Sequence, residues 1–484
     1  MFMRNEMRAS RIKVGITVLA ILLLAGGAGA VPVEEWNKTF GGTGNEGAKS
    51  VQQTSDGGYI LAGYAFSSQN GYDALLIKTD PNGNQQWNKI FGWAGEERAE
   101  SVQQTSDGGY ILAGYALLSP NGYDALVIKT DANGNQQWNK TFGGKGADEA
   151  RSVQQTSDGG YILAGKYSLL SDDGYPGDGW LIKIDANGNQ QWSKILGRTI
   201  TSCNVNVPGA TVDINASDEF GSVQQTSDGG YILAGRTETN RLEECTGFIE
   251  NAWLMKTDAN GNEQWNKPLD GPIMASSVQQ TLDGGYVLVS YSPDKKEPSG
   301  IASRSDAWLI KTDANGNVQW KETFGGAKSD AAYSVQQTKD GGYTLAGYTG
   351  SYGAGNDAWL IKTDPNGNEQ WNKTFGGAKE ERAFSVKQTS DDGYILAGYK
   401  ISSNVFTDAW LIKVKGEASE TTKIPTATPT EKAEITRVPI VGHTEKAEIT
   451  KTPTTTITEK ASGFELVLAI LTLSAIYLFR RKRI

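Results

Sequence analysis

The stretch "SVQQTSDGGYILAGY", residues 50–64, returns almost letter for letter six more times, beginning at residues 101, 152, 222, 277, 334 and 385. It belongs to a longer unit that fills residues 31–415. The unit reads W-N-K-T-F-G-G, a variable loop with an acid, S-V-Q-Q-T-x-D-G-G-Y-I-L-A-G-Y, a second variable loop, and D-A-W-L-I-K-T-D-x-N-G-N-x-Q-W. Successive copies of its tyrosine lie about 50 to 70 residues apart, a period typical of propeller blades.

Each unit contains four short strand candidates, which in the consensus are "SVQQT", "YILAGY", "AWLIKTD" and "QQWNKTF". Asp-Gly separates the first two and Asn-Gly separates the last two. Both dipeptides supply the positive φ that a tight hairpin needs. The unit therefore predicts an all-β fold made of four-stranded antiparallel sheets.

The second strand is apolar on both of its faces. Tyr59 and Leu61 alternate with Ile60 and Ala62, so neither set is polar. A sheet with one wet face alternates apolar and polar residues, whereas a sheet packed on both sides does not. This pattern predicts a blade that lies between two neighbouring blades.

The ends of the repeat region predict how the blades are arranged. Seven third strands are present, but the last unit stops at "LIKVKG" with no "NGNxQW" after it. The N-terminal "EEWNKTF" (34–40) supplies the missing fourth strand. We therefore expect a seven-bladed β-propeller over residues 31–415, closed by the N-terminal strand completing the last blade, because closure removes exposed sheet edges. The alternative is an open solenoid with an unpaired strand at each end.

The segments outside the repeats predict export and anchoring. Residues 1–30 combine basic residues, an apolar stretch and a small-residue cleavage site, as in a signal peptide; an uncleaved anchor is the alternative. Residues 416–462 are rich in Thr and Pro and predict a disordered stalk, with a short helical repeat as the alternative. Residues 463–484 hold an apolar run followed by "RRKRI", which predicts a transmembrane helix with its basic tail inside.

The C-terminal "SGFELVLAILTLSAIYLFRRKRI" resembles the C-terminal sorting signal of archaeal surface proteins. Those signals carry a Pro-Gly-Phe motif, an apolar stretch and an Arg-rich tail, and Ser462-Gly463-Phe464 stands at the motif here. The repeats also resemble propeller modules of archaeal, notably methanogen, surface proteins. The resemblance implies a cell-surface location, with an extracellular propeller anchored to the cytoplasmic membrane; it implies no defined activity.

Composition argues against two classes of function. The net charge of −9 does not favour nucleic-acid binding, which needs a basic face. The single histidine, His443, lies in the stalk, so the propeller cannot contain a Ser-His-Asp, Cys-His or His-based metal site. We expect a protein that is not an enzyme and has no cofactor. A glycoside hydrolase or lyase that uses only carboxylates is the alternative.

The variable connections should all lie on one face, because strands alternate in direction and the tight turns occupy the other. Function on a rigid scaffold usually lies on such loops. The long ones cover 168–179, 197–221, 237–250 and 292–306. Cys203 and Cys245 lie in the two insertions of the fourth blade, which predicts a disulfide between them in an exported protein. Two free thiols are the alternative.

Two sets of acids recur near this face. The first precedes the innermost strand: Glu46, Glu97, Asp148, Asp218, Asp330 and Glu381, with Ile273 in the fifth blade. The second precedes the third strand: Asp73, Asp124, Asp178, Asp306, Asp357 and Asp408, with Asn251 in the fourth blade. The first set is a weak candidate for an acidic ring at the channel mouth that binds Ca²⁺ or a basic ligand. Alternatively, each acid accepts backbone hydrogen bonds in its own turn or pairs with Arg98, Arg151 or Arg382.

Three further motifs have two interpretations each. "TDANGN" has some of the oxygens of a calcium loop, but its glycine comes fourth rather than sixth, which favours a hairpin turn. The strand tryptophans either pack between blades, which we favour, or stack on sugars: Trp87, Trp138, Trp192, Trp265, Trp320 and Trp371. Four sequons are glycosylation candidates: Asn37, Asn139, Asn215 and Asn372.

These observations favour a binding, adhesion or structural module of the cell envelope that acts through the variable-loop face. The expected partner is an envelope protein or a glycan, with the membrane reached through the C-terminal segment. The alternatives are an extracellular carbohydrate-active enzyme and a cation-dependent adhesion module.

Overall fold

A computed structural model describes residues 31–67, 71–93, 95–119, 122–168, 177–197, 203–204, 211–212, 218–240, 248–293, 305–402 and 406–416. The chain divides into two units, Met1–Ser419 and Glu420–Ile484. The second unit, the predicted signal peptide and nearly all of the predicted stalk lie outside the described residues. Among the residues that are described, no helix is long and apolar enough to cross a membrane.

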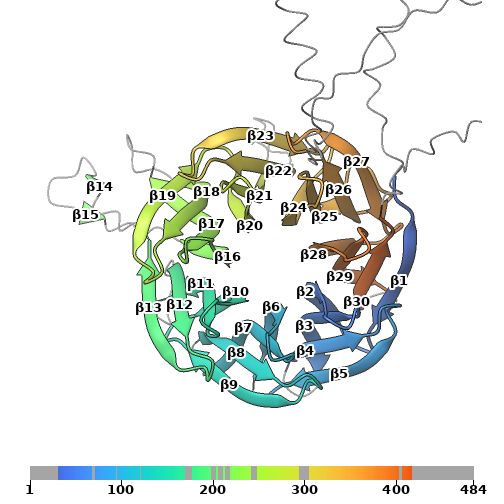
Figure 1. Cartoon of the computed structure of the whole chain (residues 1–484), viewed down its shortest axis with the longest axis horizontal. Helices are drawn as coiled ribbons and strands as arrows, with labels where there is room; N and C mark the ends of the chain where they lie inside the picture. Colours follow the sequence, from blue (N-terminus) through green and yellow to red (C-terminus); the bar gives the residue numbers. More distant parts are fainter. Residues whose placement is uncertain are drawn as a thin grey trace, which may run out of the picture. The chain divides into compact units, whose positions relative to one another are not determined.

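The first unit contains seven four-stranded sheets around a central opening, with β2, β6, β10, β16, β20, β24 and β28 innermost (Figure 1). Blade 1 is β2 (Glu46–Gln53), β3 (Tyr59–Ser67), β4 (Gly71–Thr79) and β5 (Gln85–Phe91). Blade 2 is β6 (Glu97–Gln104), β7 (Tyr110–Ser119), β8 (Gly122–Thr130) and β9 (Gln136–Phe142). Blade 3 is β10 (Glu149–Gln155), β11 (Tyr161–Tyr167), β12 (Asp178–Ile184) and β13 (Gln190–Leu196).

The fourth blade follows a short two-stranded insertion, β14 (Cys203–Asn204) with β15 (Thr211–Val212). Blade 4 is β16 (Glu219–Gln225), β17 (Tyr231–Asn240), β18 (Phe248–Thr257) and β19 (Glu263–Leu269). Blade 5 is β20 (Met274–Gln280), β21 (Tyr286–Pro293), β22 (Ser305–Thr312) and β23 (Val318–Phe324). Blade 6 is β24 (Asp330–Gln337), β25 (Tyr343–Thr349), β26 (Asp357–Thr363) and β27 (Glu369–Phe375).

The seventh sheet contains both ends of the repeat region. It consists of β28 (Glu381–Gln388), β29 (Tyr394–Ile401), β30 (Thr407–Val414) and the N-terminal β1 (Glu34–Phe40). β1 pairs antiparallel with β30, from Glu34 opposite Val414 to Phe40 opposite Ala409. The predicted seven blades of four antiparallel strands are confirmed, and β1 occupies the outer position that β5 occupies in blade 1.

The "TSDGG" hairpin turns explain why the repeat keeps its glycines. In blade 1, the N–H of Gly57 donates to the carbonyl of Thr54, and the N–H of Thr54 donates to the carbonyl of Gly58. Gly57 has a φ of 82°, the left-handed conformation that glycine adopts without strain. Blade 7 places Asp392 there at a φ of 62°.

A buried lysine ties each of these turns to the third strand. In blade 2, Lys129 donates to Asp107 at 2.8 Å, to the carbonyl of Thr130 at 2.8 Å and to Gln137 at 3.2 Å. Three acceptors match the three N–H bonds of an ammonium group. The same lysine–aspartate pair recurs in all seven blades: Lys78–Asp56, Lys129–Asp107, Lys183–Asp158, Lys256–Asp228, Lys311–Asp283, Lys362–Asp340 and Lys413–Asp391. The lysine of "LIKTD" thus holds the blade together.

The core lies between blades and repeats seven times. Ile60 and Leu61 are both buried, and they belong to different apolar clusters on opposite faces of β3. The outer-strand tryptophan of each blade meets the tyrosine of the next blade; Trp87 and Tyr110 have ring centroids 5.9 Å apart. A Cβ on Gly134 of the "NGN" turn would lie 2.6 Å from the Trp87 ring, so glycine is also required there for packing. The tryptophans are inter-blade contacts, as we favoured.

Candidate functional site

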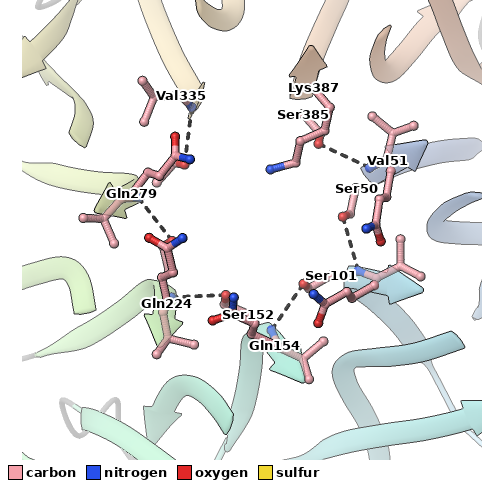
Figure 2. Close-up of a pocket in the computed structure, with 18 residues that line it drawn as sticks. Ser50, Val51, Ser101, Ser152, Gln154, Gln224, Gln279, Val335, Ser385 and Lys387 are labelled. Carbon is pink, nitrogen blue, oxygen red and sulfur yellow. Dashed lines mark hydrogen bonds between the residues drawn. The ribbon is translucent and has the colours of Figure 1, made fainter. Parts of the chain in front are cut away.

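The innermost strands line a central channel of about 330 Å³ (Figure 2). Its wall is built from the Ser-Val-Gln part of each repeat, and Lys387 is the charged residue in the described lining. Because β2, β6, β10, β16, β20 and β24 carry the same Ser-Val-Gln sequence and β28 differs only in Lys387, the channel is nearly sevenfold symmetric. Departures from the symmetry are therefore easy to locate.

Serine hydroxyl groups join neighbouring blades around this channel. The N–H of Val102 donates to the hydroxyl of Ser50 in the preceding blade at 3.2 Å. The same bond occurs at all seven junctions, including the one between blades 7 and 1, where Val51 donates to Ser385 at 3.2 Å. The wall is thus held by a ring of hydrogen bonds that runs across the sheets.

Glutamine side chains make two further rings. The second glutamine of "QQT" accepts a turn N–H from the preceding blade at all seven junctions, for example Ser390 N–H to Gln53 at 2.8 Å. The first glutamine accepts the N–H of the next blade's second glutamine at six junctions, for example Gln104 N–H to Gln52 at 2.6 Å. Each first glutamine uses its carbonyl oxygen in this bond, which leaves its NH₂ group for the channel.

The seventh junction breaks the first-glutamine ring. Blade 7 reads "SVKQT", so Lys387 stands where the other blades have a glutamine. An ammonium group cannot accept the N–H of Gln53. Lys387 extends into the opening (Figure 2), and burial among channel residues lowers the pKa of its side chain. The described channel lining supplies no carboxylate to pair with it.

The residue before each inner-strand serine differs in every blade. These residues are Lys49, Glu100, Arg151, Gly221, Ser276, Tyr333 and Phe384. Lys49 lies 3.6 Å from Glu100 and stacks 4.5 Å from the Phe384 ring centroid. Tyr333 and Phe384 have centroids 5.2 Å apart. The side chains are large in most blades and small only in blades 4 and 5.

A cavity of about 430 Å³ lies among the elements of blades 4, 5 and 6. It is lined by Arg236, Glu250, Ile273, Met274, Tyr291, Ser305, Ala331, Tyr333 and Tyr348. Arg236 and Glu250 border the variable loop 237–250, and Tyr291 and Ser305 border the variable loop 292–306. The cavity therefore opens on the predicted loop face.

Aromatic rings and an ion pair shape this cavity. The Tyr333 ring lies 6.4 Å from Tyr291 and 6.0 Å from Tyr348, centroid to centroid. Arg236 donates to Glu250 at 3.1 Å. Burial raises the pKa of Tyr333 to about 12, so its hydroxyl stays protonated at neutral pH. The cavity thus combines apolar ring faces with a positively and a negatively charged hydrogen-bonding group, a lining typical of ligand pockets.

The first set of acids does not form the ring at the channel mouth that the sequence suggested. Five of the six are at most 2% exposed and Glu46 is 8% exposed. Asp148 accepts the N–H of Gly144 and the N–H of Ser168, both at 2.7 Å. Glu46, Glu97, Asp330 and Glu381 likewise accept an N–H four residues earlier in their own loops. This geometry favours the local alternative, and cation binding stays a prediction.

The structure brings the two sets of acids together in pairs, which the sequence did not suggest. A Cβ placed on Gly376 would lie 2.6 Å from Glu381 Oε2 and 2.7 Å from Asp357 Oδ1. At four other junctions a Cβ on the corresponding glycine would likewise contact both acids of a pair. These pairs are Asp408–Glu46, Asp124–Asp148, Asp178–Asp218 and Asp306–Asp330. Asp73 is close enough to raise the pKa of Glu97. Each pair joins the third strand of one blade to the first strand of the next.

One junction lacks both acids. Asn251 of blade 4 and Ile273 of blade 5 stand at the two positions of the pair. The two departures, which look independent in the sequence, therefore fall at a single place. Ile273 lines the loop-face cavity, so the cavity forms where the repeat is broken twice.

Burial raises the pKa of several paired carboxyl groups. Desolvation raises the pKa of Glu97; the N–H of Trp93 opposes this, and Asp73 adds to it. Desolvation also raises the pKa of Asp124, with a further contribution from Asp148. Oδ1 of Asp73 and Oε1 of Glu97 are buried without a hydrogen-bond partner. Within the described part of the chain, no group of three or more His, Cys, Asp or Glu side chains is arranged to hold a metal ion.

The "TDANGN" segments form hairpin turns, as favoured. Asp131 Oδ1 accepts the N–H groups of Asn133 and Asn135 at 2.9 and 2.8 Å, and Gly134 has a φ of 76°. The aspartate is therefore occupied in closing its own turn. A calcium ion is not needed to explain its presence.

The remaining predicted sites lie partly outside the described residues. Cys203 begins β14, but Cys245 and Asn215 are not described, so the disulfide and that sequon stay predictions. The other sequons lie on outer strands: Asn37 on β1, Asn139 on β9 and Asn372 on β27. Asn37 and Asn372 also accept hydrogen bonds from Trp410 and Trp359 of the adjacent strand.

No protein-family model matches the chain. The regulatory protein FlaEY of Caulobacter vibrioides is 27% identical over 244 residues, which are 46% of this chain and 24% of the length of that protein. Solved structures that align include the WD40 propeller domain of Doa1, with 13% identity, a TM-score of 0.46 and coverage of 79% of this chain and 97% of that one. The Neurospora crassa Pan2 WD40 domain has 11% identity, a TM-score of 0.47 and coverage of 77% and 89%.

Proposed function

We propose that the chain is a binding module of the cell surface whose ligand is a glycan, bound in the loop-face cavity of blades 4, 5 and 6. The observation that carries the proposal is the coincidence of the cavity with the one junction where both repeat acids are replaced, by Asn251 and Ile273. Residues that every blade shares are explained by packing and hydrogen bonding. A ligand site is expected where one blade departs from the rest.

The lining of the cavity suits a sugar. A pyranose ring presents an apolar C–H face and a polar edge, so it needs flat aromatic surface and paired donors and acceptors. Tyr333 with its neighbours provides the first, and Arg236 with Glu250 provides the second. The hydrogen-bonded rings around the channel keep the strand ends in place, which reduces the ordering cost of binding.

The proposal includes the location and the ring. A cleaved signal over residues 1–30, a stalk over 416–462 and a membrane segment over 463–484 would present the propeller outside the cell. The β1–β30 pairing would close the ring and keep it intact without other proteins. The module binds without catalysing a reaction. The name of the Caulobacter relative states only that it is regulatory, which is compatible with a binding role.

The test is a screen of envelope glycans against the full chain and two variants. Tyr333→Ala removes the central ring of the cavity and should abolish binding of the glycan that the wild type selects. Tyr72→Ala removes a comparable tyrosine of blade 1, whose ring centroid lies 4.0 Å from the guanidinium carbon of Arg98. This variant should leave binding unchanged. Equal binding by wild type and Tyr333→Ala, or binding of no envelope glycan, would refute the proposal.

A further inference from the structure

Lys387 creates a chemically distinct place in the channel wall. In the other blades the corresponding glutamine accepts a backbone N–H of the following blade, for example Gln155 N–H to Gln103 at 2.5 Å. Lys387 offers only donors, so the equivalent N–H of Gln53 lacks the side-chain oxygen that its counterparts in the other blades have. The seventh junction therefore lacks the acceptor found at the other six, and Lys387 extends from it into the opening as a further donor (Figure 2).

The rest of the ring adds donors at the same level. The first glutamines of the other six blades spend their carbonyl oxygens on the neighbouring blade, and their NH₂ groups remain for the channel: Gln52, Gln103, Gln154, Gln224, Gln279 and Gln336. Figure 2 shows Gln154, Gln224 and Gln279 on the ring that Lys387 completes. The serine hydroxyls already accept valine N–H groups. The described lining contains no carboxylate.

We propose that the channel binds a small oxyanion, a phosphate or an organic carboxylate, between the Lys387 ammonium, the Gln53 N–H and the neighbouring glutamine NH₂ groups. An oxyanion supplies the acceptor that the seventh junction lacks, and hydrogen bonds between charged partners are the strong ones. The site is separate from the loop-face cavity and does not depend on the ligand bound there. The chain's net charge of −9 does not oppose it, because the charged residue in the described lining at this level is Lys387, which is a cation.

The experiment uses the full chain with inorganic phosphate and acetate as probes and chloride at equal ionic strength as the reference. Titration calorimetry and melting temperature are measured for the wild type, Lys387→Gln, Lys387→Met and Lys328→Gln. Lys387→Gln restores the residue of the other six blades, Lys387→Met removes the charge without restoring the amide, and Lys328→Gln removes an exposed lysine elsewhere.

The wild type and Lys328→Gln should bind phosphate or acetate and melt at a higher temperature in its presence. Both Lys387 variants should lose about tenfold or more in affinity, the loss expected for one charged hydrogen bond. In chloride alone, Lys387→Gln should melt above the wild type because it regains the bond to Gln53. Phosphate binding without acetate binding would identify the phosphate class, and the reverse result the carboxylate class. Equal response of wild type and Lys387→Gln, or no binding to either probe, would overturn the proposal.

Discussion

Replacement of Ser385 by alanine tests whether the ring closes between blades 7 and 1. Ser385 accepts the N–H of Val51 at 3.2 Å, and the two residues are 7% and 1% exposed. Ser334 of blade 6 accepts the N–H of Val386 of blade 7 at 3.2 Å, at a junction between two blades that are consecutive in the chain. These residues are 6% and 0% exposed. The two bonds have the same geometry and burial, so Ser334→Ala is a matched control.

The expected cost is the same for both variants. Each leaves one buried backbone N–H without an acceptor, which costs about 1–3 kcal/mol. Because the serines line the central channel, where water can replace the lost acceptor, the lower half of that range, about 1–2 kcal/mol, is expected. The free energy of unfolding is measured by urea titration followed by tryptophan fluorescence, with the wild type alongside.

The comparison separates a closed ring from an open stack. In a closed ring, the midpoints of Ser385→Ala and Ser334→Ala shift equally. In an open solenoid, blades 7 and 1 do not meet, and Ser385→Ala behaves as an exposed substitution within about 0.5 kcal/mol of the wild type. A full shift for Ser334→Ala with none for Ser385→Ala would refute closure by β1.

Three further predictions follow from the repeated interactions. Partial burial raises the pKa of Asp107, but hydrogen bonds from Lys129 and Thr105 outweigh it and lower that pKa to about 2. Its ionised form therefore stabilises the fold above about pH 4, and the stabilisation is lost as the pH falls toward 2. Asp107→Asn should make this acid limb of a stability–pH curve shallower by one of seven equivalent groups, and an unchanged limb would contradict the assignment. Burial raises the pKa of Glu97, so its contribution is greatest below its unfolded pKa and declines as the pH rises through the folded value. Glu97→Gln should remove that decline, so the melting temperature of the variant should rise above that of the wild type more at pH 8 than at pH 4; a loss of melting temperature that is larger at pH 8 than at pH 4 would show instead that the ionised carboxylate stabilises the fold. Trp87→Ala should destabilise the protein by about 2–4 kcal/mol, a little below a fully buried tryptophan, and leave glycan binding intact; lost binding in a variant that remains folded would favour the sugar-stacking alternative.

Much of the fold could be predicted because the same structural unit is repeated seven times in the sequence. Asp-Gly and Asn-Gly fixed the hairpins, and the apolar character of both faces of "YILAGY" placed each sheet between two others. The lysine of "LIKTD" was harder to interpret. A lysine at the end of a strand is expected to be exposed to solvent, and only the structure shows that Lys129 is buried against Asp107.

The candidate sites were less predictable, because they depend on which residues meet across blades. The acids of the two sets were recognised, but their pairing needs the third strand of one blade to lie beside the first strand of the next. Asn251 and Ile273 look like separate exceptions in the sequence, although they occupy one junction. Lys387 was visible as "SVKQT" among six copies of "SVQQT". Its meaning depends on the direction of the glutamine bonds, which the sequence alone does not give.

The central claim is that ligand binding occurs where the copies differ. The most direct measurement is the affinity for the selected envelope glycan after the repeat's own acids are restored by Asn251→Asp and Ile273→Asp together. Ile273 lines the cavity, and the pair would recreate the junction found between the other blades. We predict a folded protein that has lost glycan binding at least about tenfold. A folded double variant that binds the glycan as tightly as the wild type would contradict the account.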